Sequence, residues 1–250
     1  MLYDLIVIGG GPAGYHGASL AGKHGLQTLL IEQSAIGGVC LNAGCIPSKT
    51  WLQSAKILAH ARNGAAYGVH VGELSLDQQR VTARKNKVVK ILGAGINKQL
   101  QQNKVTVVKA KGEIQGRDGT GFKVKTEEEI HTGKNLLIAT GSVPIVPPIE
   151  GLAAACGEGW VLTNEEIFNL TAIPQTLVVI GGGVIGLELA SYFNAAGSKV
   201  TVIEMRDQIG GETDSEIAAV LLNNYRKKGV DFRLKAKVTA VRGHKVQFTT

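Results

Sequence analysis

The stretch YDLIVIGGGPAG, residues 3–14, decides the fold of this 250-residue chain. Its first half is short, apolar and rich in β-branched residues, which predicts a strand of a parallel sheet over Tyr3–Ile8. The glycines Gly9, Gly11 and Gly14 then follow in the G-x-G-x-x-G register. That register suits a tight turn, close approach of the backbone to a pyrophosphate, and close packing of the next helix on the strand.

A second predicted strand and an acidic residue complete this unit. Residues 28–31 are apolar and end at Glu32, whose carboxylate can accept hydrogen bonds from ribose hydroxyls. The intervening helix begins at the glycines, so its free N–H groups and positive dipole end are directed at phosphate. Strand, glycines, helix, strand and acid, in this order, predict a dinucleotide-binding βαβ unit.

The same unit occurs again 172 residues later. Residues 177–180 predict a strand, GGGVIG follows at 181–186, and a second strand over 199–203 ends at Glu204. In both units the first glycine and the acid are 23 residues apart. The repeat predicts an α/β fold with two Rossmann-like domains and parallel sheets. A structural repeat with only one working site is the alternative.

Between the two units, the pattern predicts two helices and an antiparallel β-meander. The expected elements are helices at 47–60 and 76–102 and strands at 105–110, 122–126 and 130–140, with turns at 116–121 and 133. Half of the six prolines stand at 144, 147 and 148, where they cannot continue a helix or a sheet ladder. We therefore expect a junction at 143–152 and domains over 1–148 and 149–250.

Two cysteines, Cys40 and Cys45, stand five residues apart in the run GGVCLNAGCIPSKT, residues 37–50. Bridged cysteines need Cα atoms about 4.4–6.8 Å apart, whereas five residues of ideal helix rise about 7.5 Å. A disulfide therefore requires a bent backbone, which Gly44 and Pro47 favour. Next to a dinucleotide-binding unit, the pair predicts a redox dithiol beside a cofactor, and two inert thiols are the alternative.

Composition describes an ordinary soluble protein, with 44% hydrophobic residues. No apolar run reaches the ~20 residues that span a membrane. The first predicted strand begins almost at Met1, which leaves no room for a targeting peptide. Three cysteines do not form a secreted disulfide scaffold. We therefore expect a cytoplasmic protein with no membrane partner.

The net charge of +7 is unevenly distributed. Residues 80–125 contain twelve Lys or Arg against only Glu113 and Asp118. Phe122 is the one aromatic residue of this stretch, so a platform for stacking bases is absent from its sequence. We interpret the stretch as a solvated helix face and expect no nucleic-acid partner; polyanion binding is the alternative. No His/Cys spacing resembles a metal site, so no metal is expected.

The motifs CLNAGCIPSK at 40–49, GPAGY at 11–15 and GGGVIGLE at 181–188 resemble those of the class I pyridine nucleotide-disulfide oxidoreductases. Within that family, the run around the cysteines is most similar to that of the enzymes that oxidise dihydrolipoamide. The resemblance covers the whole chain and implies FAD in the first unit and NAD in the second. It implies oxidation of dihydrolipoamide by NAD⁺ to lipoamide and NADH. A glutathione- or mercuric-type reductase is the alternative.

The resemblance also implies roles for individual residues. Cys40 would exchange with the substrate dithiol, Cys45 would face the flavin, and Lys49 would lie near the flavin and pair with Glu188. The implied FAD contacts are Gly9, Gly11, Pro12, Ala13, Gly14, Glu32, Gly38, Val39, Cys40, Lys49, Gly112, Thr140, Gly141 and Ser142. The implied NAD contacts are Gly181, Gly183, Val184, Ile185, Gly186, Glu188, Glu204 and Val238.

The resemblance further implies partners and a larger assembly. Glu204 favours NAD⁺, because its carboxylate would repel a 2′-phosphate, whereas Arg206 points the other way. Implied partners are dihydrolipoyl groups on lipoyl domains or the H-protein, and the E2 core of 2-oxo acid dehydrogenase complexes, which such an enzyme serves as the E3 component. The family also has a C-terminal interface domain that forms a homodimer. These 250 residues do not include that domain, so we expect impaired activity from them alone, or a nucleotide-binding module without activity.

Overall fold

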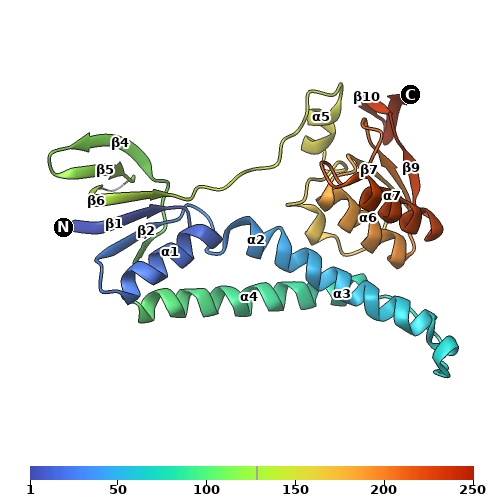
Figure 1. Ribbon diagram of the computed structural model, residues 1–250, viewed down its shortest axis with the longest axis horizontal. Helices are drawn as coiled ribbons and strands as arrows, with labels where there is room; N and C mark the ends of the chain where they lie inside the picture. The colour runs from blue at the N-terminus through green and yellow to red at the C-terminus, as the bar shows by residue number, and fades with distance from the viewer. Residues whose placement is uncertain (128) are drawn as a thin grey trace. The chain divides into compact units, whose positions relative to one another are not determined.

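The computed structural model describes residues 1–127 and 129–250 and contains two compact units (Figure 1). The first comprises residues 1–47 and 86–143, and the second comprises 48–85 and 144–250. The break at 143/144 lies at the start of the expected junction. Residues 48–85 group with the second unit because Trp51, Ala55 and Val81 belong to its hydrophobic core. The assignment of 1–148 to one nucleotide and 149–250 to the other stays a prediction.

The first unit is built on a six-stranded mixed sheet in the order β3-β2-β1-β6-β5-β4. β1, β2, β3 and β6 are parallel to their neighbours in this group, and β4, β5 and β6 form an antiparallel meander. The strands are β1 (Leu2–Ile8), β2 (Thr28–Ile31), β3 (Thr106–Val108), β4 (Glu113–Asp118), β5 (Gly121–Lys125) and β6 (Ile130–Ile138).

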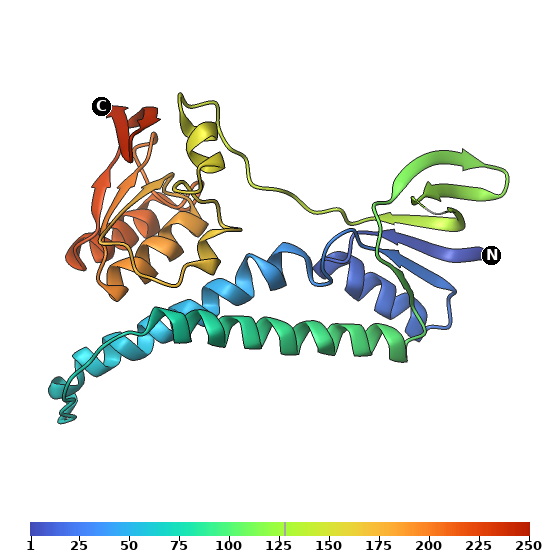
Figure 2. The ribbon, with the colours of Figure 1, turned by 180° about the vertical axis from the view of Figure 1, so that it is seen from behind.

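Helices cover one face of this sheet and the β4–β5 hairpin packs on the other (Figure 2). The covering helices are α1 (Pro12–Lys23) and α4 (Gln78–Gln102), and the first turns of α4 belong to the second unit. The short helix α2 (Gly38–Asn42) also lies in the first unit, whereas all but the first three residues of α3 (Cys45–Arg62) belong to the second unit. On the helical side, Ala18 of α1 and Leu100 of α4 pack against Val7. On the opposite side, Val124 of β5 packs against Ile6. Each large apolar side chain buried in this way contributes about 1.5–3 kcal/mol.

Three details of the predicted meander are wrong. β3 pairs in parallel with β2, so the strand expected at 105–110 belongs to the main sheet. β4 was not predicted, because all of its residues are exposed and give no apolar alternation. Gly133 lies inside β6 and makes no turn. A Cβ there would lie 2.7 Å from Cγ1 of Ile6, so this glycine makes room for the core.

The second unit contains a three-stranded parallel sheet in the order β7-β8-β9 and a two-stranded antiparallel hairpin. The strands are β7 (Thr176–Ile180), β8 (Lys199–Ile203), β9 (Asp231–Arg233), β10 (Lys237–Arg242) and β11 (Lys245–Thr249). The helices are α5 (Leu152–Gly157), α6 (Val184–Ala196) and α7 (Ser215–Lys227), with 3₁₀ turns η1 (Gly64–Tyr67) and η2 (Ile167–Asn169).

An aromatic cluster forms the centre of the second unit. Trp51 of α3 is 1% exposed and its ring lies 4.7 Å from that of Tyr192 in α6. Phe168 and Phe193 contact the same indole edge to face. Burial of these rings ties the part of α3 around Trp51 to the core of the second unit.

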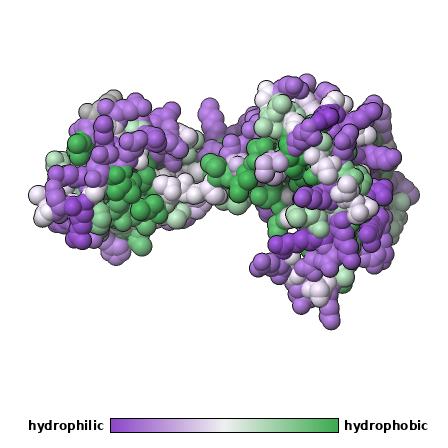
Figure 3. Space-filling view, turned by 90° about the horizontal axis from the view of Figure 1, so that it is seen from above, coloured by the Kyte–Doolittle hydropathy of each residue, from purple (hydrophilic) through white to green (hydrophobic). Residues whose placement is uncertain are grey.

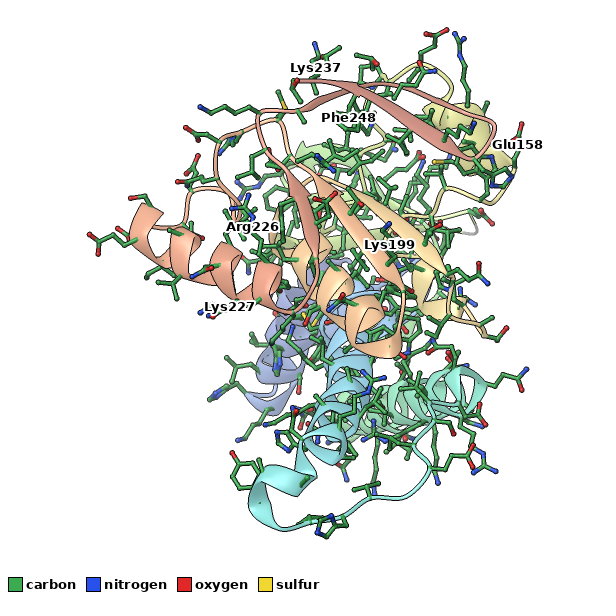
Figure 4. The ribbon with its side chains drawn as sticks, turned by 90° about the vertical axis from the view of Figure 1, so that its right-hand side faces the viewer. Glu158, Lys199, Arg226, Lys227, Lys237 and Phe248 are labelled. Atoms are coloured by element: carbon green, nitrogen blue, oxygen red, sulfur yellow. The ribbon has the colours of Figure 1, made fainter. Side chains whose placement is uncertain are left out.

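Helix α7 carries an acidic cap at its start and basic residues at its end. The Asp214 carboxylate accepts hydrogen bonds from the N–H groups of Glu216 and Ile217 at its start. Arg226 and Lys227 stand in its last turn (Figure 4), where positive charge favours the negative end of the helix dipole.

The basic stretch is mostly but not wholly solvated. Ten of its twelve basic residues are exposed, Lys123 is half-buried, and Lys85 is buried at 4% exposure. Burial lowers the pKa of the Lys85 ammonium.

Hydrophobic surface is also present on the molecule (Figure 3), and its most exposed residues include Ile138, Val143 and Ile145. Within the described residues, no helix is both long and apolar enough to cross a bilayer.

Candidate functional site

The first glycine loop connects β1 to α1 and leaves no room for side chains at two positions. Gly9 has φ +101°, and a Cβ on it would lie 2.2 Å from the carbonyl oxygen of Ala139. A Cβ on Gly14 would lie 1.8 Å from the carbonyl oxygen of Gly9. Gly11 is the N-cap of α1, and Pro12 fits the first turn, where its missing N–H costs nothing.

The Glu32 carboxylate is held against this loop by main-chain donors. Its Oε2 accepts from the N–H of Gly10 at 2.6 Å, and its Oε1 accepts from the N–H of Ser34 at 2.7 Å. Hydrogen bonds to an ionised acceptor are short and strong. The acid that sequence analysis placed at the ribose therefore lies directly beside the glycine loop.

The second glycine loop repeats these hydrogen bonds, although a Cβ on Gly181, unlike one on Gly9, would meet nothing within 4 Å. Gly181 has φ +100°, and a Cβ on Gly186 would lie 2.5 Å from the carbonyl oxygen of Gly181. The Glu204 carboxylate accepts from the N–H of Gly182 at 2.7 Å and from that of Arg206 at 2.8 Å. The offset of 172 residues therefore holds for individual hydrogen bonds, and also for the β1–β2 and β7–β8 registers.

The helix N-termini at both loops are accessible. Pro12 and Ala13 are exposed, and Val184 and Ile185 are 64% and 58% exposed. A Cβ on Gly183 would meet nothing within 4 Å. Accessible N–H groups at the positive end of a helix suit a pyrophosphate, so the residues present at both loops fit a dinucleotide.

A cavity of about 530 Å³ adjoins Glu32 in the first unit. Its polar lining includes Ser34, Asn42, Lys90 and Lys109. It gives space for a polar ligand beside the carboxylate.

Other predicted FAD contacts gather around the first loop. A Cβ on Gly38 would lie 2.7 Å from the Cα of Gly11, so these two backbones touch. Val39 follows Gly38 in α2 and is 41% exposed. The strand β6 ends just before Thr140, whose Cα lies 3.1 Å from a Cβ built on Gly9.

Three further residues, Gly141, Ser142 and Gly112, were also predicted to contact FAD. Gly141 and Ser142 are exposed directly after Thr140. Gly112 lies against the core, because a Cβ on it would be 3.3–3.5 Å from Val124, Ile31 and Ile8. A cofactor role for these positions remains a prediction.

The two cysteines lie on different helices. Cys40 belongs to α2 and is half-buried, and Cys45 is the exposed first residue of α3. Between them the helix is interrupted, and a Cβ on Gly44 would lie 3.4 Å from the Cα of Cys40. The backbone is thus bent where a disulfide requires a bend. α3 begins two residues before the expected Pro47, which its first turn accommodates because those N–H groups need no intrahelical partner. The disulfide itself stays a prediction.

The predicted pair of Lys49 and Glu188 is present. Lys49 Nζ lies 2.6 Å from Glu188 Oε1, with side chains 61% and 28% exposed. The Glu188 charge also acts on Tyr225, whose hydroxyl donates to the carbonyl of Leu187 at 3.0 Å. Burial, and after it the Glu188 charge, raise the pKa of Tyr225.

Val238 lies in β10 and is buried at 8% exposure. It packs in a hydrophobic cluster with Ile203, the last residue of β8, and with Ala236. Its side chain therefore contributes to the core under the end of β8. A contact with the adenine of NAD stays a prediction.

Sequence analysis missed one further repeated element, the Ile-Gly-Gly loops at 36–38 and 209–211. The N–H of Gly37 donates to the carbonyl of Gly10 at 2.8 Å, and that of Gly210 donates to the carbonyl of Gly182 at 2.8 Å. The signal was present in the sequence. One inserted residue before the second loop breaks the offset of 172, so a fixed-offset comparison does not align them.

A family model described as pyridine nucleotide-disulphide oxidoreductase matches residues 3–250. The chain belongs to this family. The chain is similar to the dihydrolipoyl dehydrogenase of Acholeplasma laidlawii, 40% identical over 99% of this chain and 73% of that protein. The dihydrolipoyl dehydrogenase of Mycoplasma genitalium is 36% identical over 100% of this chain and 54% of that protein.

Solved structures agree with this membership. The HOCl-induced flavoprotein disulfide reductase RclA from Escherichia coli, in a Cu(II) complex, matches with a TM-score of 0.81 and 32% identity. The match covers 100% of this chain and 53% of that chain. This chain therefore spans about half the length of RclA and of the Mycoplasma relative.

Proposed function

We propose that the chain is the FAD- and NAD-binding part of a flavoprotein that oxidises dihydrolipoamide with NAD⁺. One observation carries the proposal. The loop that touches Gly11, at Gly38, continues directly into the bent segment that bears Cys40 and Cys45. In this proposal, the dithiol lies in the wall of the dinucleotide site. The relatives named dihydrolipoyl dehydrogenase support the choice of substrate.

In this proposal, the first unit holds FAD through its glycine loop, Glu32 and the Gly38–Val39 segment. The second unit holds NAD through its glycine loop and Glu204. FAD, when bound, supplies the two-electron carrier between a dithiol and NAD⁺. The chain itself orients both nucleotides by main-chain donors and by two fixed carboxylates.

The thiol chemistry proposed for the chain is an exchange that conserves electrons. A substrate thiolate attacks the sulfur of Cys40, the Cys40–Cys45 bond breaks, and Cys45 leaves as a thiolate. The second thiolate of the same substrate then attacks the substrate sulfur that is bonded to Cys40. The mixed disulfide breaks, and Cys40 leaves as a thiolate. The substrate dithiol loses two protons and two electrons and becomes cyclic lipoamide, and the cysteine pair is reduced. Lys49 follows Cys45 by one turn of α3, and its positive charge would favour the thiolate.

The choice of NAD⁺ over NADP⁺ rests on Glu204. Its carboxylate is fixed by the N–H groups of Gly182 and Arg206, and its negative charge would repel a 2′-phosphate. Arg206 contributes its main chain to this arrangement, while its side chain is exposed. We therefore assign NAD⁺ to the second unit.

The proposed partners are dihydrolipoyl groups on lipoyl domains or the H-protein, and the E2 core of a 2-oxo acid dehydrogenase complex. A homodimer of the longer protein and a cytoplasmic location belong to the same proposal. The likeness to RclA favours a second candidate, a flavoprotein reductase for a different disulfide.

The test is NADH formation from dihydrolipoamide and NAD⁺ by the complete, longer protein, purified with FAD bound. Cys40→Ser and Cys45→Ser should each lower this rate about a thousand-fold or more while FAD stays bound. Cys156→Ser, in α5, is the matched control and should leave the rate unchanged. Reduction of glutathione disulfide by NADPH, without dihydrolipoamide oxidation, would reject the assignment in favour of the second candidate.

A further inference from the structure

The middle glycine of the second glycine loop has both of its main-chain groups bound by the protein. The N–H of Gly182 donates to Glu204 Oε2 at 2.7 Å. Its carbonyl oxygen accepts from the N–H of Gly210 at 2.8 Å. Gly210 has φ +79°, a left-handed conformation that suits glycine.

This second bond sets the direction of the next N–H group. A trans peptide is planar, so the N–H of Gly183 points opposite to the carbonyl of Gly182. Because that carbonyl faces Gly210, the N–H of Gly183 faces away from the Ile-Gly-Gly loop, at the start of α6. A phosphate at the helix N-terminus would meet this N–H. The position of Gly210 therefore controls a donor for the nucleotide.

Two side chains hold Gly210 in place. The hydroxyl of Thr213 donates to the carbonyl of Gly210 at 2.7 Å. The amide of Gln208 donates to the carbonyls of Gly211 at 3.0 Å and Thr213 at 3.1 Å. Both side chains are half-buried, and Ile209 between them is fully buried. The loop is thus fixed on both sides of Gly210.

The first unit holds its own Ile-Gly-Gly loop by the same kind of contact. The amide of Asn42 donates to the carbonyls of Ile36 at 3.2 Å and Gly38 at 2.9 Å. The N–H of Gly37 meets the carbonyl of Gly10 as Gly210 meets Gly182. In the first unit the carboxamide comes from Asn42, after the loop, and in the second it comes from Gln208, before the loop. Both amides bind the carbonyl of the second glycine, Gly38 or Gly211, and their other acceptors differ.

We propose that Gln208 and Thr213 are positioning residues for the nicotinamide nucleotide of the second unit. They act through Gly210, whose bond to Gly182 orients the N–H of Gly183. This inference rests on the proposed assignment of NAD to that unit. The variants Thr213→Val and Gln208→Ala each remove side-chain donors. They leave in place the two loop glycines with positive φ, Gly210 and Gly211.

The experiment measures the Kd of NADH and of ADP-ribose for the FAD-loaded protein. Each variant should raise both Kd values about three- to tenfold, the loss expected for one ordinary hydrogen bond. Thr213→Ser keeps the hydroxyl and should bind as the wild type does. Thr239→Val is the matched control, since its hydroxyl also donates to a main-chain carbonyl, that of Gln247, in the β10–β11 hairpin.

Bound FAD and the unfolding midpoint are measured on the same samples. A purely structural role would shift the midpoint and leave the two Kd values unchanged, which would overturn the proposal. If both variants keep the Kd values of the wild type, and the wild type binds both ligands, the positioning role is overturned while the nucleotide assignment stands. A wild type that binds neither ligand would reject the nucleotide assignment of the second unit as well.

Discussion

The two glycine loops are nearly identical, but the segments after them differ. In each unit, the middle glycine donates to the strand-end carboxylate and accepts from an Ile-Gly-Gly loop. After the first Ile-Gly-Gly loop come the broken helices with Cys40 and Cys45. After the second comes a single helix that Asp214 caps. The two units thus share the main-chain geometry that the proposed function assigns to nucleotide binding, and they differ in the short downstream segment, which carries the cysteine pair only in the first unit.

The strands that support the two loops also differ in burial. β1 is paired on both sides, with β2 and β6, and Ile6 and Val7 are fully buried. Within the described residues β7 is paired only with β8, and Val178 and Ile180 are 42% and 38% exposed. Equal perturbations of the two loops should therefore cost more in the first unit.

Alanine at the third glycine of each loop gives the largest expected effect. A Cβ on Gly14 would lie 1.8 Å from a main-chain oxygen, which cannot move without shifting β1. At Gly186 the corresponding distance is 2.5 Å. We expect Gly14→Ala to lower the free energy of unfolding by about 3 kcal/mol or more, and Gly186→Ala by about 1–3 kcal/mol.

Chemical denaturation of the two variants checks this order. Gly141→Ala is a useful control, because Gly141 also has a positive φ but a Cβ there would meet nothing within 4 Å. Its backbone strain alone should cost about 1 kcal/mol. Equal losses for Gly14→Ala and Gly186→Ala would show that the buried setting of β1 makes no difference.

Removal of either strand-end carboxylate should weaken the binding of one nucleotide and leave the binding of the other almost unchanged. Glu32→Ala leaves the buried N–H of Gly10 without its acceptor, and Glu204→Ala does the same to Gly182, at a cost of about 1–3 kcal/mol each. Glu32→Ala should lower FAD affinity with little change in NADH affinity, and Glu204→Ala should do the reverse. Flavin content and NADH titration measure the two effects. Loss of both ligands in both variants would contradict two independent sites.

Much of the fold could be predicted from the sequence because main-chain turns leave clear signals. The strands ending at Glu32 and Glu204 were predicted almost to the residue, since apolar runs and glycines mark both ends. β4 could not be predicted, because its six residues are all exposed and carry no alternation. The parallel pairing of β3 with β2 depends on contacts distant in the sequence, which local patterns do not encode.

The candidate site shows the same division. The ion pair of Lys49 and Glu188 joins residues 139 apart, and only the family resemblance suggested it. Both Ile-Gly-Gly sequences are present in the chain. They were not recognised as a repeat, because the one-residue insertion shifts the second out of the offset of 172. The amide of Asn42, between the two cysteines, was not assigned a role, since side-chain direction is fixed only by the folded loop.

Helix capping gives a smaller effect that is confined to the second unit. Asp214→Ala removes the acceptor for the N–H groups of Glu216 and Ile217 at the start of α7. We expect a loss of about 1 kcal/mol in unfolding free energy, measured by denaturant titration. Asp207→Ala, an exposed aspartate before the helix, is the matched control and should cost less than half as much. A cost equal to that of the control would mean that the cap contributes nothing.

Titration of Tyr225 gives the smallest effect and reports on the second unit alone. Burial raises the pKa of Tyr225 above the ordinary value of about 10, and the Glu188 charge adds to this. The folded state therefore keeps a proton that the unfolded state has lost. Its contribution to stability is complete below pH about 10 and is lost as the pH rises through the raised pKa. Tyr225→Phe should flatten this alkaline loss, measured as unfolding free energy against pH. Glu188→Gln should bring the pKa of Tyr225 closer to its ordinary value in a spectrophotometric titration. An unchanged pKa in that variant would show that burial alone sets it, and that the charge of Glu188 in α6 does not act on Tyr225 in α7.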